Sequence, residues 1–190
     1  MPRYYAGIGT RELLPRHEQY KREQIDIARR AALAGLDLKS GGADFSDNNH
    51  LLGAHLGGRG KTAIIVRSKE FPHFHKSIRE IPTVMLMEEE DYQKAVEYFY
   101  MHGIFKQKHF ESMGAFARNA HARNFFQIMN PQGTEPDVEF VSYLAREDRW
   151  GNVSGGTRTA VAVARQEGVP NFNIRFTSQL SELQRLVTSL

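Results

Sequence analysis

Three glycine-containing segments hold the residues of this sequence that could bind a ligand. They read GIGT at 7–10, SGGAD at 40–44 and SGGT at 154–157. Each is expected to lie in a connection from a strand to a helix, because an apolar run precedes it and helical spacing follows. Glycine lets the backbone approach a ligand closely, and the amides at a helix start favour an anion. The three segments therefore predict one site for a phosphate, a ribose or a base.

Charged side chains beside these segments add binding and acid–base chemistry. Arg11 and Arg158 follow two of the segments at a similar offset, and the planar arginine fork suits phosphate. Asp44 and Asp47 flank the second segment, where a carboxylate could bind ribose hydroxyls or act as a general base. Glu12 is a third acid–base candidate. Plainer roles stay open, since both arginines could be exposed and Asp44 could cap a helix.

None of the three segments completes a known phosphate-binding motif. GIGT is not the dinucleotide fingerprint GxGxxG, because Glu12 stands at the place of the third glycine. The phosphate loop GxxxxGK[ST] is also absent from the sequence. Each glycine could simply make a tight turn, but three such segments at equivalent places favour a shared pocket.

The composition is that of a single globular domain, 1–190. The chain has 190 residues, of which 41% are hydrophobic and 25% charged. No apolar run approaches the ~20 residues of a membrane span, and the N-terminus has no signal-peptide pattern. Together with the lack of cysteine, this predicts a cytoplasmic protein without a membrane partner. The net charge of +3 permits a nucleotide or a nucleic acid as partner and requires neither.

Alternating strand and helix patterns predict an α/β protein with a parallel sheet covered by helices on both faces. Strands are expected at 4–8, 36–39, 61–66, 138–144 and 170–174. Helices are expected at 15–34, 44–56, 90–101, 111–129, 157–166 and 181–190. Segment 82–87 is open between a strand and the lead into a helix, and 71–81 is expected to be a loop.

The middle of the chain, 67–110, is a candidate insertion rich in aromatic residues. These are Phe71, Phe74, Tyr92, Tyr98, Phe99, Tyr100 and Phe105. Such side chains could form core, stack on a nucleobase or pack against a second subunit. The aromatic run YFYMHGIF favours a helical insertion that packs in a homo-oligomer.

The eight histidines do not predict a metal site. His50 and His55 are five residues apart, so they do not stack on one face of a helix. His73 and His75 fall in the expected loop, and no carboxylate cluster completes a ligand set. No cofactor is expected beyond a bound nucleotide derivative.

Five segments in this order resemble the SLOG superfamily, the Rossmann-like proteins that include DprA/Smf and the LOG cytokinin-activating enzymes. They are YYAGIGTRE, LDLKSGGADFSDN, HARNFFQI, PDVEFVSYL and GGTRTAVAVARQEGVPNFNI. The sequence is most similar to the small DprA-like proteins of bacteriophages. The resemblance implies a Rossmann-like three-layer sandwich with a mostly parallel sheet that binds a nucleotide or a nucleotide derivative.

The resemblance also implies which residues contact that ligand. The three walls of the pocket would be Gly7, Gly9, Thr10 and Arg11, then Ser40, Gly41, Gly42, Ala43, Asp44 and Asp47, and finally Gly155, Gly156 and Thr157. Arg123 and Asn124 match an Arg-Asn pair that would face the same pocket. LOG enzymes carry a PGGxGTxxE signature whose glutamate takes part in catalysis. The segment VSGGTRTAV lacks that glutamate, which argues against LOG-type hydrolysis.

Three functions are compatible with these residues. The first is binding of a nucleotide or a nucleotide-derived signalling molecule, ADP-ribose-like or a cyclic nucleotide. A phage protein of this kind would sequester a defence signal in the cytoplasm of its bacterial host. The second is a hydrolase that cleaves a nucleotide at its N-glycosidic or phosphate bond. The third is a DprA-like recombination mediator that binds single-stranded DNA. Binding without catalysis is slightly favoured, because no catalytic constellation is evident.

Overall fold

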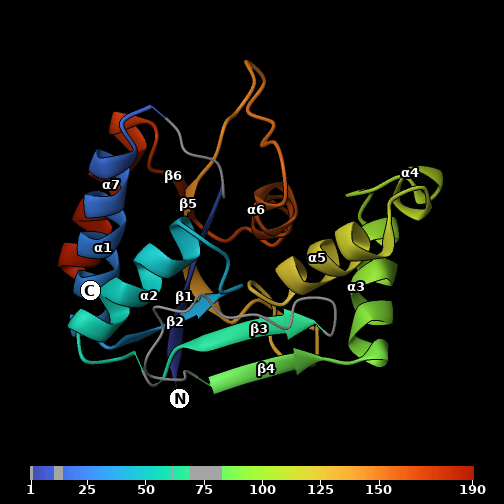
Figure 1. Ribbon diagram of the computed structural model, residues 1–190, viewed down its shortest axis with the longest axis horizontal. Helices are drawn as coiled ribbons and strands as arrows, with labels where there is room; N and C mark the ends of the chain where they lie inside the picture. Colours follow the sequence, from blue (N-terminus) through green and yellow to red (C-terminus); the bar gives the residue numbers. More distant parts are fainter. Residues whose placement is uncertain (1, 11–14, 61, 69–82) are drawn as a thin grey trace.

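A six-stranded sheet forms the centre of the protein (Figure 1). The computed structural model describes residues 2–10, 15–60, 62–68 and 83–190. The strands are β1 (Arg3–Gly9), β2 (Leu36–Ser40), β3 (Ile64–Ser68), β4 (Thr83–Met87), β5 (Val138–Leu144) and β6 (Asn171–Asn173). Their order is β4-β3-β2-β1-β5-β6, and all five pairs of neighbours are parallel.

Helices cover both faces of this sheet. They are α1 (His17–Leu33), α2 (Ser46–Leu56), α3 (Glu89–Met101), α4 (Gln107–Glu111), α5 (Ala115–Phe125), α6 (Thr157–Gln166) and α7 (Thr177–Ser189). In Figure 1, α1, α2 and α7 gather on one side of the sheet, and α3, α5 and α6 on the other. Each group packs on its own buried hydrophobic cluster. This confirms the predicted Rossmann-like three-layer architecture.

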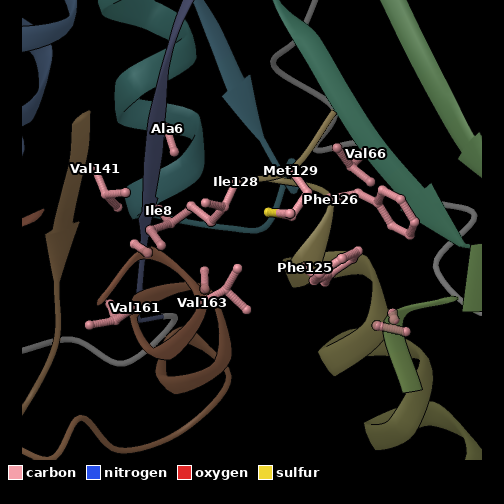
Figure 2. Packing of buried hydrophobic residues seen from close by; sticks show 14 of the residues in the cluster. Ala6, Ile8, Val66, Phe125, Phe126, Ile128, Met129, Val141, Val161 and Val163 are labelled. Atoms are coloured by element: carbon pink, nitrogen blue, oxygen red, sulfur yellow. The ribbon is translucent and has the colours of Figure 1, made fainter. Parts of the chain in front are cut away.

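The alternation of side chains along β1 explains how one strand serves two cores. Tyr5 packs in the cluster under α1 and α2, whereas Ala6 and Ile8 belong to the cluster on the other face. Both faces of a parallel sheet are buried, so its strands are apolar throughout. Figure 2 shows Ile8 beside Ile128, which follows α5, and near Val163 of α6. The second core therefore joins β1 to α5 and α6.

The strand order reverses between β1 and β5. From β1 the chain adds β2, β3 and β4 on one side, and then returns to place β5 on the other side of β1. The connection after β1 leads to α1 on one face, and the connection after β5 leads to α6 on the opposite face. The two connections diverge, and such a switch point is where open α/β sheets bind ligands.

Several expected elements have different limits in the structure. Segment 82–87 contains the parallel strand β4, which extends the sheet as its edge. The single helix expected at 111–129 is divided, because Gly114 is extended (φ −61°, ψ 153°) and α5 begins after it. Asp44 is not a helix cap, since α2 follows Phe45, whose φ is 64°. None of the described helices is both long and apolar enough to cross a membrane.

The aromatic part of the middle segment forms core within the region that the structure describes. Phe99 of α3 is fully buried and meets Phe105, Phe110 and Phe125 edge-on or tilted. The packing of α3 against α5 therefore accounts for much of the aromatic run. Phe71, Phe74, His73 and His75 lie outside the described residues.

Candidate functional site

A cavity of about 230 Å³ lies at the switch point and is lined by all three glycine segments. The first segment contributes Gly9 and Thr10, and the second contributes Ala43 together with Asp47 of α2. The third contributes its entire length, 154–157. The cavity is closed on its remaining side by residues of α5 and of the turn that follows it. The structure thus brings together segments that are far apart in the sequence.

The second segment folds around the buried carboxylate of Asp47. The Oδ2 atom of Asp47 accepts hydrogen bonds from the backbone amides of Gly41 and Ala43, each at 3.1 Å. The side chain is 3% exposed. Burial raises the pKa of the Asp47 carboxyl, while the nearby Arg123 guanidinium and the two amides act in the opposite direction. Asp47 therefore fixes the loop and also presents a carboxyl group of perturbed pKa to the cavity.

Gly41 is the point where three polar side chains converge. Besides the bond to Asp47, its carbonyl accepts a hydrogen bond from Arg123 Nη1 at 3.1 Å. A Cβ atom at this position would lie 2.7 Å from Arg123 Cζ and still closer to Gln127 Nε2. Glycine is required at position 41 because any side chain would displace Arg123 and Gln127 from the cavity wall.

Arg123 and Asn124 of α5 connect the second and third segments. Asn124 Nδ2 donates to the carbonyl of Gly156 at 2.6 Å, while Arg123 reaches Gly41. Arg123 Nε and Nη2 also donate to Asn124 Oδ1, at 3.3 and 3.1 Å. Both side chains line the cavity and are more than nine-tenths buried. Both members of the Arg-Asn pair therefore lie on the wall of this cavity.

The third segment leads directly into the N-terminus of α6. Gly156 is the N-cap residue and provides no side-chain cap, and Thr157 begins the helix. Gly155 has a φ of 72°, and a Cβ atom there would meet no other atom within 4 Å. The amides of a first helical turn attract negative charge. These amides suit an anionic group, and the Arg123 guanidinium, which bonds the Gly41 carbonyl of the second segment, adds positive charge to the same cavity.

The first segment serves packing as well as the cavity. A Cβ atom on Gly7 would lie 2.7 Å from His50 Cβ, and one on Gly9 would lie 2.7 Å from Ser46 Cβ. The two glycines therefore let α2 approach β1. The hydroxyl of Ser40 donates to the carbonyl of Gly7 at 2.7 Å, which ties the first segment to the second behind the cavity wall.

Some predicted site residues lie elsewhere. Arg158 stands over the Phe105 ring at 5.1 Å and donates to the Ile104 carbonyl at 3.4 Å, so it faces the connection between α3 and α4. Asp44 is exposed and does not line this cavity. Ser40, Gly41, Gly42 and Gly7 support the wall from behind rather than lining it. Arg11 and Glu12 lie outside the described residues.

Sequence reasoning missed Gln127 and Ala120, which also line the cavity. Gln127 follows Arg123 by four residues, the spacing that places two side chains on one face of a helix. That spacing was the available signal. Buried Lys39 was also missed: its Nζ atom donates to the Met129 carbonyl at 2.8 Å and to Asp137 Oδ1 at 2.6 Å. It anchors the chain just beyond Gln127.

Within the part of the chain that the structure describes, no group of three or more His, Cys, Asp or Glu side chains is arranged to hold a metal ion. Comparisons with protein-family models, with curated proteins and with solved structures found no match to this chain. The resemblance to the SLOG superfamily remains a prediction that rests on the five sequence segments given above.

Proposed function

We propose that this protein binds a nucleotide or a nucleotide-derived signalling molecule in the cavity between β1 and β5. One observation carries the proposal: three glycine segments, the Arg123–Asn124 pair and the α6 N-terminus meet around the same cavity. A switch-point cavity with positive and hydrogen-bonding groups is the usual place and chemistry for such ligands in α/β proteins.

The two ends of the cavity suit different parts of a nucleotide. The amides at Gly155, Gly156 and Thr157 favour a phosphate. Asp47, in the first turn of α2, supplies a carboxyl group to the same cavity that can accept hydrogen bonds from sugar hydroxyls. The volume of about 230 Å³ is below the roughly 300–1,000 Å³ of pockets for drug-sized ligands. We therefore expect the cavity to enclose the phosphate and sugar, with the rest of the ligand outside.

Calorimetry with nucleoside monophosphates, ADP-ribose and cyclic dinucleotides tests this proposal. Binding of at least one of them is expected, and chromatography of the recovered ligand should show it intact. Absence of binding by every ligand at high micromolar concentration would contradict the proposal. Recovery of a nucleobase or of free phosphate would instead establish cleavage.

The Thr157→Val variant tests the phosphate end. It removes a hydroxyl from the cavity and preserves the shape of the side chain. A hydrogen bond to a charged group contributes roughly 1.5–3 kcal/mol, so affinity should fall by about tenfold or more. Thr177→Val is the matched control, because Thr177 also begins a helix, α7, but is exposed. An unchanged affinity in Thr157→Val would remove this residue from the phosphate site.

Asp47 supports hydrolysis of a nucleotide as the second candidate function. Its carboxyl group is buried at the cavity, and burial raises its pKa, which is the change expected of a group that exchanges protons near neutral pH. The same chromatography decides between the two functions, since only the hydrolase converts its ligand.

A further inference from the structure

Gln127 presents to the cavity an amide that bonds to none of the described residues. The residue follows α5, is 2% exposed and lines the cavity wall. Its side chain makes no hydrogen bond to any residue in the described part of the chain. Asn124, by contrast, uses Nδ2 on the Gly156 carbonyl and Oδ1 on Arg123. Of these two buried amides of the wall, Gln127 is therefore the one that can serve a ligand.

A buried amide without a partner lowers the stability of the folded protein. Native proteins leave few such groups, and those that persist call for a functional or solvent partner. Gln127 is held at this place by the glycine at position 41, which leaves room for its Nε2 atom. The local structure thus accommodates an amide that none of the described residues satisfies, and a ligand in the cavity would supply its partner.

Asp47 and Gln127 approach Gly41 together and form one recognition surface. Asp47 uses Oδ2 for the amides of Gly41 and Ala43, and the Ser40 side chain is a further hydrogen-bond partner of this carboxyl group. A carboxylate has acceptor sites beyond these bonds. An ionised carboxylate only accepts hydrogen bonds, whereas a carboxamide both donates and accepts. Two adjacent hydroxyl groups match this pair, because one can donate to the carboxylate while the other exchanges hydrogen bonds with the carboxamide.

We propose that Gln127, together with Asp47, binds the vicinal diol of a ribose and makes the site select ribonucleotides over 2′-deoxyribonucleotides. This inference rests on the nucleotide-binding function proposed above and deepens it. The sugar is the fitting partner because it is directly attached to the 5′-phosphate, whose site at Gly155–Thr157 belongs to the same small cavity. A base is one step further away, and the acceptor nitrogens of its ring would be repelled by Asp47.

Calorimetry with two matched ligand pairs tests the selectivity. The pairs are adenosine 5′-monophosphate with its 2′-deoxy analogue, and ribose 5-phosphate with 2-deoxyribose 5-phosphate. The ribose member of each pair should bind about tenfold or more tightly, because the deoxy analogue leaves a buried polar group without a partner. Equal affinities within both pairs would overturn the inference and leave the proposed function standing. Failure of all four ligands to bind would overturn the inference, whereas the proposed function falls only if ADP-ribose and the cyclic dinucleotides fail to bind as well.

Variants at position 127 assign the selectivity to this side chain. In Gln127→Met, adenosine monophosphate should bind as weakly as its deoxy analogue, whose own affinity should hardly change. Gln127→Asn keeps the amide on a side chain shorter by one methylene group, so the ratio of ribose to deoxyribose affinity should be intermediate. This variant tests the inference even if the methionine variant folds poorly. Gln107→Met, at an exposed position of α4, is the control and should keep the wild-type ratio. A wild-type ratio in well-folded Gln127→Met would overturn the role of Gln127.

Discussion

The absence of a side chain at Gly41 decides the shape of the cavity wall. Three side chains reach Gly41, those of Asp47, Arg123 and Gln127. The φ of Gly41 is not positive, so the backbone there does not require glycine. The reason for glycine here is space rather than backbone freedom. Its neighbour Gly42 is different, because a φ of 66° makes that position unfavourable for other residues. The two glycines of one segment therefore have separate physical causes.

Gly41→Ala should weaken both the fold and ligand binding. The added methyl group would lie 2.7 Å from Arg123 Cζ, and overpacking of this kind costs about 1–3 kcal/mol of unfolding free energy. Displacement of Arg123 and Gln127 should also reduce nucleotide affinity in calorimetry. Gly114→Ala is the matched control, since a Cβ atom there meets nothing within 4 Å and φ is −61°. Equal melting temperatures for the two variants would contradict this account.

The helix α5 assembles the site from separate elements. Its residues face two glycine segments at once, through Arg123 toward Gly41 and Asn124 toward Gly156. A second contact joins α5 to α6, where His121 Nδ1 lies 2.6 Å from Thr159 Oγ1. Burial, with the charge of Arg158, lowers the pKa of His121 to about 4, so this histidine is neutral at pH 7. The helix thus holds the α6 N-terminus in place beside the second segment.

Asn124→Ala should loosen this connection between α5 and α6. The change leaves the carbonyl of Gly156, which is bonded at a part-buried position, and part of the buried Arg123 side chain without their partner, which costs roughly 1–3 kcal/mol. Hydrogen exchange should accelerate at the start of α6, and nucleotide affinity should fall. Asn119→Ala provides the comparison, because Asn119 lies on the same helix but bonds only the Ala115 carbonyl at an exposed position. Identical exchange in both variants would count against the connecting role of Asn124.

The stability of the whole molecule depends on one histidine, His50, whose side chain is enclosed between α2 and β1. His50 is fully buried against Gly7, and neither ring nitrogen has a hydrogen-bond partner among the residues that the structure describes. Burial lowers the pKa of His50 to about 3, whereas an unfolded chain would have a value near 6.5. Between these values the unfolded state binds more protons. The free energy of unfolding therefore decreases as the pH falls through this window.

Urea unfolding between pH 7 and pH 4 measures this dependence. One proton taken up only on unfolding gives a slope that approaches about 1.4 kcal/mol per pH unit. His50→Leu should flatten the profile, because leucine cannot be protonated. His55→Leu alters an exposed position of the same helix and should leave the slope as in the wild type. A profile equally steep in both variants would show that the acid sensitivity arises elsewhere.

Local sequence patterns determined most of the strands and helices of this protein. They also indicated that each glycine segment lies near the end of a strand. Strand patterns and helical spacing depend on neighbouring residues, so the expected strands at 4–8, 36–39, 138–144 and 170–174 agree with β1, β2, β5 and β6. The same patterns placed the three segments in strand-to-helix connections, but the structure has Gly7 and Gly9 within β1 and Ser40 at the end of β2, so two segments begin inside their strands. The limits of α4 and α5 could not be read in this way, because Gly114 interrupts a run that otherwise favours a helix.

Only the tertiary structure decided which of the candidate residues meet. The reversal of strand order beside β1 sets the cavity between β1 and β5, and strand order is a property of long-range packing. Asp44 and Asp47 looked equivalent in the sequence, yet one turn of backbone exposes the first and buries the second. Arg158 had the sequence position of a phosphate-binding residue, but in the structure it packs on the Phe105 ring. Gln127 gained its place because the turn after α5 lies beside segments that are far from it in the sequence, which no local pattern records.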